Sequence, residues 1–136
     1  MELSIECLSK RFGSKIAVNN ISVTLQPGVY GLLGANGAGK TTLMRMVCDV
    51  LKPTSGRILY NGKEIEQLGE HYRSYLGYLP QDFGYYPDFT AKEYLNFMYE
   101  LKKVKLPRQK HIEDICRTVK IDHVYTRLIR NLSKGY

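Results

Sequence analysis

Eight consecutive residues carry glycines, a lysine and a hydroxyl at spacings that suit phosphate chemistry. They match the pattern G-x-x-x-x-G-K-S/T and read Gly34-Ala35-Asn36-Gly37-Ala38-Gly39-Lys40-Thr41. Glycines allow the backbone to form a concave nest of N–H donors, and a following helix adds its positive end. In this pattern Lys40 reaches the outer phosphates and the Thr41 hydroxyl ligates magnesium. A chance match is expected in roughly one chain of this length in a hundred or fewer, so the loop predicts phosphate binding.

The segments around this loop predict the elements that must position it. A helix begins near Gly39-Lys40 and ends before Pro53, with Leu43, Met44 and Val47 at helical spacing. Runs rich in branched residues, separated by turn signals, predict short strands. Asn61-Gly62 predicts the turn of a hairpin. The expected strands are 3–7, 21–25, 29–33, 56–60 and 76–79.

Two helices are predicted after residue 88, where the apolar period changes to that of a helix. Thr90 and Glu93 form a capping-box pattern at the start of the first helix, and Pro107 begins the second. Each helix has one apolar stripe. The stripes are Tyr94, Leu95, Met98 and Leu101 in the first helix and Ile112, Ile115, Cys116 and Val119 in the second.

Length and composition indicate a soluble globular domain. The chain has 136 residues, of which 43% are hydrophobic and 24% charged. Its longest uncharged stretch, 16–39, is rich in asparagine and glycine, so no membrane span is expected. The amino terminus has neither a basic leader nor an apolar core, which favours a cytoplasmic location. A net charge of +7 suits nucleic acid, an anionic membrane or an acidic ligand, although solvated lysines explain it most simply.

The cysteines and histidines do not form a metal or disulfide pattern. The three cysteines are odd in number and widely spaced, so we expect small core residues. We expect the three histidines at the surface. These residues are Cys7, Cys48 and Cys116, and His71, His111 and His123.

The order of several motifs resembles that of the ATP-binding subunits of ABC transporters. The segments that carry the resemblance are 8–13 (LSKRFG), 17–22 (AVNNIS), 34–43 (GANGAGKTTL), 53–56 (PTSG), 79–82 (LPQD) and 132–136 (LSKGY). The resemblance implies an α/β P-loop NTPase fold with a mixed sheet, in which an antiparallel β subdomain joins parallel core strands. It divides the chain into a nucleotide-binding core at 1–82 and a partial helical subdomain at 83–136.

The resemblance also implies roles for single residues. Phe12 would stack on adenine, Gln81 would contact magnesium or the attacking water, and Thr42 would add a hydroxyl to the phosphates. Ser133 and Gly135 would face the γ-phosphate held by a second subunit. The loop positions that bind the phosphates are Gly34, Asn36, Gly37, Ala38, Gly39, Lys40 and Thr41.

Aromatic residues cluster just after Gln81, over 83–89. In the family this region faces the membrane subunit. Aromatic clusters also occur in small satellite cores, and tyrosines near basic residues can stack on RNA bases. The sequence leaves these three interpretations open.

The implied function is ATP hydrolysis coupled to transport. Two subunits would meet head to tail with ATP-Mg between them, beside a transmembrane permease at the inner face of the membrane, and nucleic acid is disfavoured. Residues 132–136 resemble the family signature LSGGQ, but Lys134 replaces its first glycine and Tyr136 its glutamine. This variant resembles that of ABC-2 type exporters. In the family, a strand that ends in Asp-Glu follows this signature and supplies a carboxylate for magnesium, and a histidine after it orients the attacking water. The sequence reaches neither, so we expect weak nucleotide binding, negligible hydrolysis and a tendency to self-associate. Alternatives are an ABC ATPase acting on ribosomes or DNA, and a small kinase or GTPase.

Overall fold

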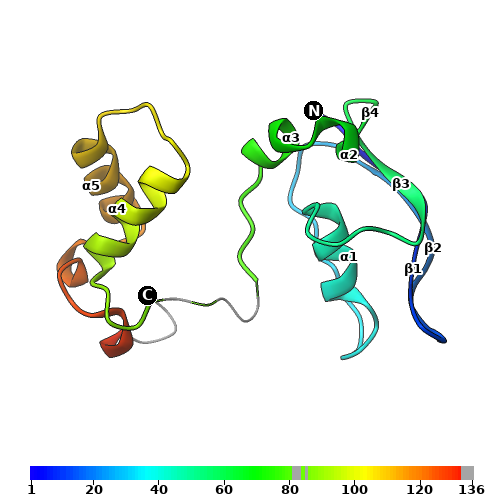
Figure 1. Cartoon of the computed structure of the whole chain (residues 1–136), viewed down its shortest axis with the longest axis horizontal. Helices are drawn as coiled ribbons and strands as arrows, with labels where there is room; N and C mark the ends of the chain where they lie inside the picture. Colours follow the sequence, from blue (N-terminus) through cyan, green and yellow to red (C-terminus); the bar gives the residue numbers. More distant parts are fainter. Residues whose placement is uncertain (81–83, 85, 133–136) are drawn as a thin grey trace. The chain divides into compact units, whose positions relative to one another are not determined.

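The computed structural model describes residues 1–80, 84 and 86–132 of the chain (Figure 1). The chain divides into two compact units, Met1–Leu79 and Pro80–Tyr136. In the part of the chain that the structure describes, no helix has the length and apolarity needed to cross a membrane.

The first unit is built on a four-stranded antiparallel sheet with the strand order β2-β1-β3-β4. Its strands are β1 (Leu3–Phe12), β2 (Lys15–Leu25), β3 (Ser55–Tyr60) and β4 (Lys63–Glu64). Strands β1 and β2 are longer than predicted and form a hairpin that closes where Phe12 pairs with Lys15. The predicted turn between β3 and β4 is confirmed, with φ of 49° at Asn61 and 76° at Gly62.

Two of the predicted strands do not form. Residues 29–33 and 76–79 have no strand structure, although the sequence pattern of both favours one. A strand requires a neighbouring ladder, and neither segment pairs with another segment among residues 1–80, 84 and 86–132. The sheet described is therefore wholly antiparallel, and the strands predicted at 29–33 and 76–79 are wrong.

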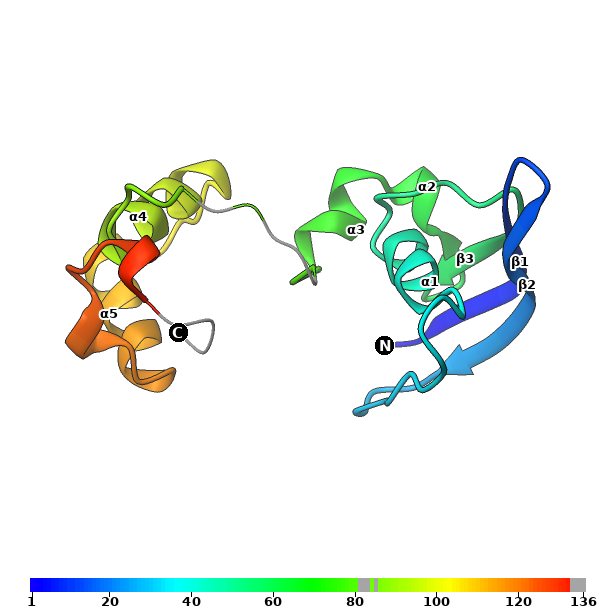
Figure 2. The ribbon, with the colours of Figure 1, turned by 90° about the horizontal axis from the view of Figure 1, so that it is seen from below.

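One helix packs against this sheet and sets the position of the loop before it. Helix α1 (Lys40–Val47) buries Met46, which is 1% exposed, in a core with Leu8 and Ile58. Of the apolar residues predicted at helical spacing, Leu43 and Val47 pack against this core, whereas Met44 is 44% exposed. Figure 2 shows α1 beside the sheet, and the short helices α2 (Ile65–Leu68) and α3 (Glu70–Ser74) complete the unit.

The second unit consists of helices, with its core between α4 (Ala91–Leu101) and α5 (Arg108–Thr118). Tyr99, Ile112 and Cys116 are buried there together. Two short 3₁₀ turns, η1 (Asp122–Val124) and η2 (Ile129–Asn131), follow the helices.

The sequence predicted the start of α4 correctly, since the capping box of Thr90 and Glu93 is present. Both predicted apolar stripes were too wide. In the first, Leu101 is 63% exposed and Tyr99 is buried in its place; in the second, Ile115 and Val119 are exposed. The two helices contact along a narrow seam, so the outer members of each stripe remain at the surface.

Two other sequence expectations need correction. Cys7 is exposed, whereas Cys48 and Cys116 are buried as expected. Cys7 has φ of 47° and lies at an irregularity in the pairing of β1 with β2. Its N–H donates to the Ser22 hydroxyl at 2.8 Å. The irregularity interrupts the alternation of buried and exposed side chains along the strand. His111 is half-buried with its ring against Tyr99, rather than at the open surface.

Candidate functional site

The loop over residues 34–41 has the backbone conformation that its glycines predict. Gly37 and Gly39 have φ of 83° and 89°, values in the left-handed region that other residues rarely adopt. The N–H of Ala38 donates to the carbonyl of Ala35 at 3.2 Å, which closes a turn within the loop. Asn36 lies in the same turn and Gly34 at its start, both exposed to solvent.

Gly39 is also the point where the loop meets the sheet. A Cβ atom at this position would lie 2.0 Å from the carbonyl oxygen of Ala17 in β2. Only a glycine allows the two backbones to approach this closely. The hairpin of β1 and β2 therefore supports the loop directly.

The start of α1 presents unpaired backbone donors beside this loop. The first hydrogen bond of the helix runs from the N–H of Leu43 to the carbonyl of Gly39 at 2.9 Å. The N–H groups of Lys40, Thr41 and Thr42 precede it and have no partner within the helix. Gly39 provides no side-chain cap, and the first turn contains no acidic residue. This arrangement favours an anion at the start of the helix.

Lys40 adds a fixed positive charge to the same place. Its Nζ donates to the carbonyl oxygens of Gly34 and Ala35, at 2.6 and 2.8 Å. An ammonium group has three donors, so one remains for a phosphate oxygen while the other two hold the side chain over the loop.

The far end of α1 is fixed by a buried tyrosine. The Tyr72 hydroxyl donates to the carbonyl of Val47 at 2.7 Å. Burial raises the pKa of Tyr72 to about 12, and electrostatic interactions with the ionisable groups of Cys48 and Asp49 act in the same direction. Tyr72 therefore remains a neutral donor, and α1 is held at both of its ends.

A family comparison agrees with this geometry. The model of the family described as "ABC transporter" matches residues 18–136. The chain belongs to the ABC transporter family. Its match includes the whole of the 34–41 loop and α1. The interpretation of this loop as part of a small kinase or GTPase is therefore wrong.

Individual ABC transporter proteins resemble the chain over most of its length. The lipopolysaccharide export system ATP-binding protein LptB of Haemophilus influenzae is 33% identical over 138 residues, covering 98% of this chain and 57% of that protein. The molybdate/tungstate import ATP-binding protein WtpC of Methanocaldococcus jannaschii is 31% identical over 134 residues, covering 98% and 44%. The chain thus spans about half the length of these relatives, which include an importer and an exporter.

A solved structure also has the same fold. It is named "Putative ABC transporter (ATP-binding protein)" from Pyrococcus furiosus, and it aligns with a TM-score of 0.81 at 28% identity. The alignment covers 98% of this chain and 64% of that one. The α/β P-loop NTPase fold predicted from the sequence is confirmed.

Other residues that the ABC transporter resemblance singled out lie in different parts of the chain. Phe12 ends β1 and is 49% exposed, and Lys10 Nζ lies 5.4 Å from the centroid of its ring. Gln81, Ser133 and Gly135 lie outside the described residues. Sequence reasoning missed Lys10, although residues two apart on a strand share a face and this spacing could have indicated the contact.

Magnesium would find a suitable ligand in Thr41. This residue is exposed in the first turn of α1, next to the amides that favour an anion. Magnesium prefers oxygen ligands and is bound in phosphate sites by few protein groups together with phosphate oxygens and water. A single hydroxyl beside an anion-binding loop fits this chemistry.

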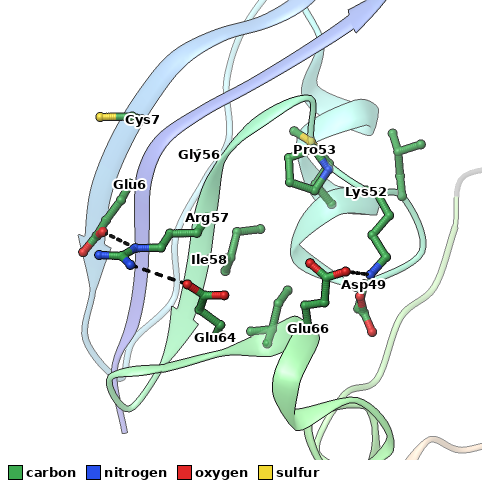
Figure 3. Close-up of a pocket in the computed structure, with 13 residues that line it drawn as sticks. Glu6, Cys7, Asp49, Lys52, Pro53, Gly56, Arg57, Ile58, Glu64 and Glu66 are labelled. Atoms are coloured by element: carbon green, nitrogen blue, oxygen red, sulfur yellow. Dashed lines mark hydrogen bonds and ion pairs between the residues drawn. The ribbon is translucent and has the colours of Figure 1, made fainter.

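A second hollow in the first unit has a volume of about 440 Å³ and shares no residue with the loop (Figure 3). Figure 3 shows that its charged side chains point toward one another. Arg57 pairs with Glu6 and Glu64, and Lys52 pairs with Glu66. The lining carries four carboxylates, of Glu6, Asp49, Glu64 and Glu66, against the two cations of Lys52 and Arg57. The hollow is therefore less suited to an anion than the loop is.

Aromatic side chains of the second unit form a local cluster. Tyr86 stacks on Phe89 with ring centroids 4.9 Å apart, and the edge of Phe97 meets Tyr86 at 5.6 Å. Local packing thus accounts for part of the aromatic segment, while Phe83 and Tyr85 lie outside the described residues. Tyr86 is still 51% exposed, so the cluster also presents an aromatic surface.

Proposed function

We propose that the chain binds ATP-Mg through residues 34–41 and forms part of an ATPase that drives transport. The observation that carries the proposal is the convergence of the Lys40 ammonium group with the unpaired amides at the start of α1. Both groups offer hydrogen-bond donors beside one loop. A triphosphate satisfies these donors together, which no single side chain of the unit does.

Each remaining residue has a role in this proposal. The phosphates lie along the amides from Gly37 to Thr42, and Thr41 ligates magnesium. The adenine ring stacks on the exposed face of Phe12. Gln81 contacts magnesium or orients the attacking water, within a nucleotide-binding core that we assign to residues 1–82.

The helical part, residues 83–136, contributes to the partner surfaces. We assign Ser133 and Gly135 to contact with the γ-phosphate on a second subunit, in a head-to-tail pair. The aromatic cluster of Tyr86, Phe89 and Phe97 suits contact with a permease at the inner face of the membrane. Support comes from the relatives, whose names describe ATP-binding proteins of import and export systems.

Replacement of Lys40 tests the proposal. We expect Lys40→Ala to weaken binding of ATP-Mg by about tenfold or more, because hydrogen bonds to charged groups contribute about 1.5–3 kcal/mol. Isothermal titration calorimetry measures the affinity. Lys110→Ala, in the second unit, removes the same charge far along the chain and serves as the control. Equal affinity of Lys40→Ala and the unmutated chain, with both folded by circular dichroism, would contradict the proposal.

A further inference from the structure

We propose that Lys10 is a positioning residue for adenine, because it holds the Phe12 ring in place from one side. This inference rests on the proposed binding of ATP at residues 34–41. It assigns a role to a lysine that the phosphate loop does not use.

The contacts of Lys10 place its charge against the ring. Its Nζ lies 5.4 Å from the centroid of Phe12. The same Nζ donates to the carbonyl oxygen of Lys52 at 2.6 Å. The ammonium group is therefore tied to backbone on one side and attracted to the negative face of the ring on the other.

This arrangement leaves only one face of Phe12 for a ligand. The ring is 49% exposed although the cation lies over one of its faces. A base that stacks on Phe12 must take the opposite face. Because the ring is already restrained, less side-chain freedom is lost when the base binds.

The end of β1 is further fastened to the segment that follows α1. The N–H of Arg11 donates to the Thr54 hydroxyl at 3.0 Å, and the N–H of Thr54 donates to the carbonyl of Ser9 at 2.8 Å. Together with the bond from Lys10 to the carbonyl of Lys52, three hydrogen bonds join this strand end to residues 52–54.

The same hairpin contacts the phosphate loop. The carbonyl of Ala17 in β2 meets Gly39, and Phe12 pairs with Lys15, two residues before Ala17. At about 3.3 Å per residue, the contact lies on the order of 7 Å along the strand from the residue paired with Phe12. Lys10 thus restrains the adenine end of a site whose phosphate end is braced by the same hairpin.

The test compares ligands with and without the base. We expect Lys10→Met to weaken binding of ATP-Mg by about two- to fivefold, the loss of one exposed cation–π contact. Lys63→Met, at an exposed position on β4 of the same sheet, removes the same charge away from Phe12 and sets the contribution of charge alone. Relative to Lys63→Met, the affinity of Lys10→Met for magnesium tripolyphosphate should be unchanged. Lys10→Arg, which keeps a cation, should retain most of the affinity for ATP.

A second background separates positioning from a general structural role. In Phe12→Ala, adding Lys10→Met should change the affinity for ATP no more than adding Lys63→Met does, since the ring that Lys10 holds is gone. An effect of Lys10→Met beyond that of Lys63→Met that persists without the ring would overturn the inference while ATP binding itself stands. Equal effects of Lys10→Met and Lys63→Met in the unmutated background would overturn it as well. Failure of the unmutated chain to bind both ATP and tripolyphosphate would instead overturn the proposed function, and this inference with it.

Discussion

Two glycines of the phosphate loop have similar backbone conformations but different surroundings. Comparing alanine substitutions at the two positions separates the cost of a left-handed backbone from the cost of a steric clash with β2. Gly37 and Gly39 have φ of 83° and 89°. A Cβ at Gly37 would meet nothing within 4 Å, whereas a Cβ at Gly39 would lie 2.0 Å from the carbonyl oxygen of Ala17. Gly37→Ala therefore incurs only the cost of a left-handed backbone, about 1–2 kcal/mol. Gly39→Ala should destabilise the first unit more.

Urea denaturation followed by circular dichroism measures this difference. We expect the midpoint of Gly39→Ala to fall below that of Gly37→Ala, and both to fall below that of the unmutated chain. Equal midpoints for the two variants would show that the loop moves away from β2 at no cost, and that the sheet does not support the loop.

At the scale of elements, the capping box of α4 is a local device whose energetic effect can be measured. The Thr90 hydroxyl accepts from the N–H of Glu93 at 3.2 Å, and the Glu93 carboxylate accepts from both the N–H and the hydroxyl of Thr90. We expect Thr90→Ala to lower the free energy of unfolding by about 1 kcal/mol at neutral pH. Thr118→Ala is the matched control, because this exposed threonine ends α5 and its hydroxyl donates to the carbonyl of Asp114 at 2.8 Å, away from the start of α4.

The effect of this substitution should depend on pH. Hydrogen bonds from the backbone N–H of Thr90, and then from its hydroxyl, lower the pKa of Glu93 below its ordinary value of 4.5. A lowered folded-state pKa contributes stability above the unfolded value, and this stability is lost as pH falls through the folded value. Alanine at position 90 keeps the N–H that donates to Glu93 but lacks the hydroxyl. The part of the difference between Thr90→Ala and the unmutated chain that comes from the hydroxyl should therefore be lost as pH falls below about 4.5. A difference that stays constant from neutral pH to pH 3 would contradict this role of the carboxylate.

The elements that the sequence predicted correctly are those fixed by neighbouring residues. The start of α4 follows from Thr90 and Glu93, and the turn between β3 and β4 follows from Asn61-Gly62. Residues 29–33 have the branched side chains of a strand, but pairing depends on a distant partner and cannot be deduced from the segment itself. The candidate site also combines local and distant features. The loop could be predicted from its own residues, whereas the contact of Ala17 with Gly39 depends on how β2 lies in the folded sheet.

At the scale of the molecule, the unpaired segments of the first unit should govern its behaviour in solution. Val29, Leu33 and Leu79 are 103%, 92% and 78% exposed, in stretches of extended chain without strand structure. Exposed apolar side chains beside unpaired backbone are a recognised cause of association between chains. We expect the chain to form oligomers whose proportion rises with protein concentration, as sedimentation velocity would detect.

Charged substitutions test whether these segments cause the association. Val29→Lys, Leu33→Lys and Leu79→Lys together should shift the chain toward the monomer, because each lysine replaces an exposed apolar side chain with a charge. The control combines Leu101→Lys, Leu106→Lys and Val119→Lys, at positions that are 63%, 55% and 56% exposed in the second unit. This control adds the same number of charges but leaves residues 29–33 and 76–79 intact, so its oligomers should persist. If the control dissociates as fully as the variant at Val29, Leu33 and Leu79, net charge rather than these two segments controls association.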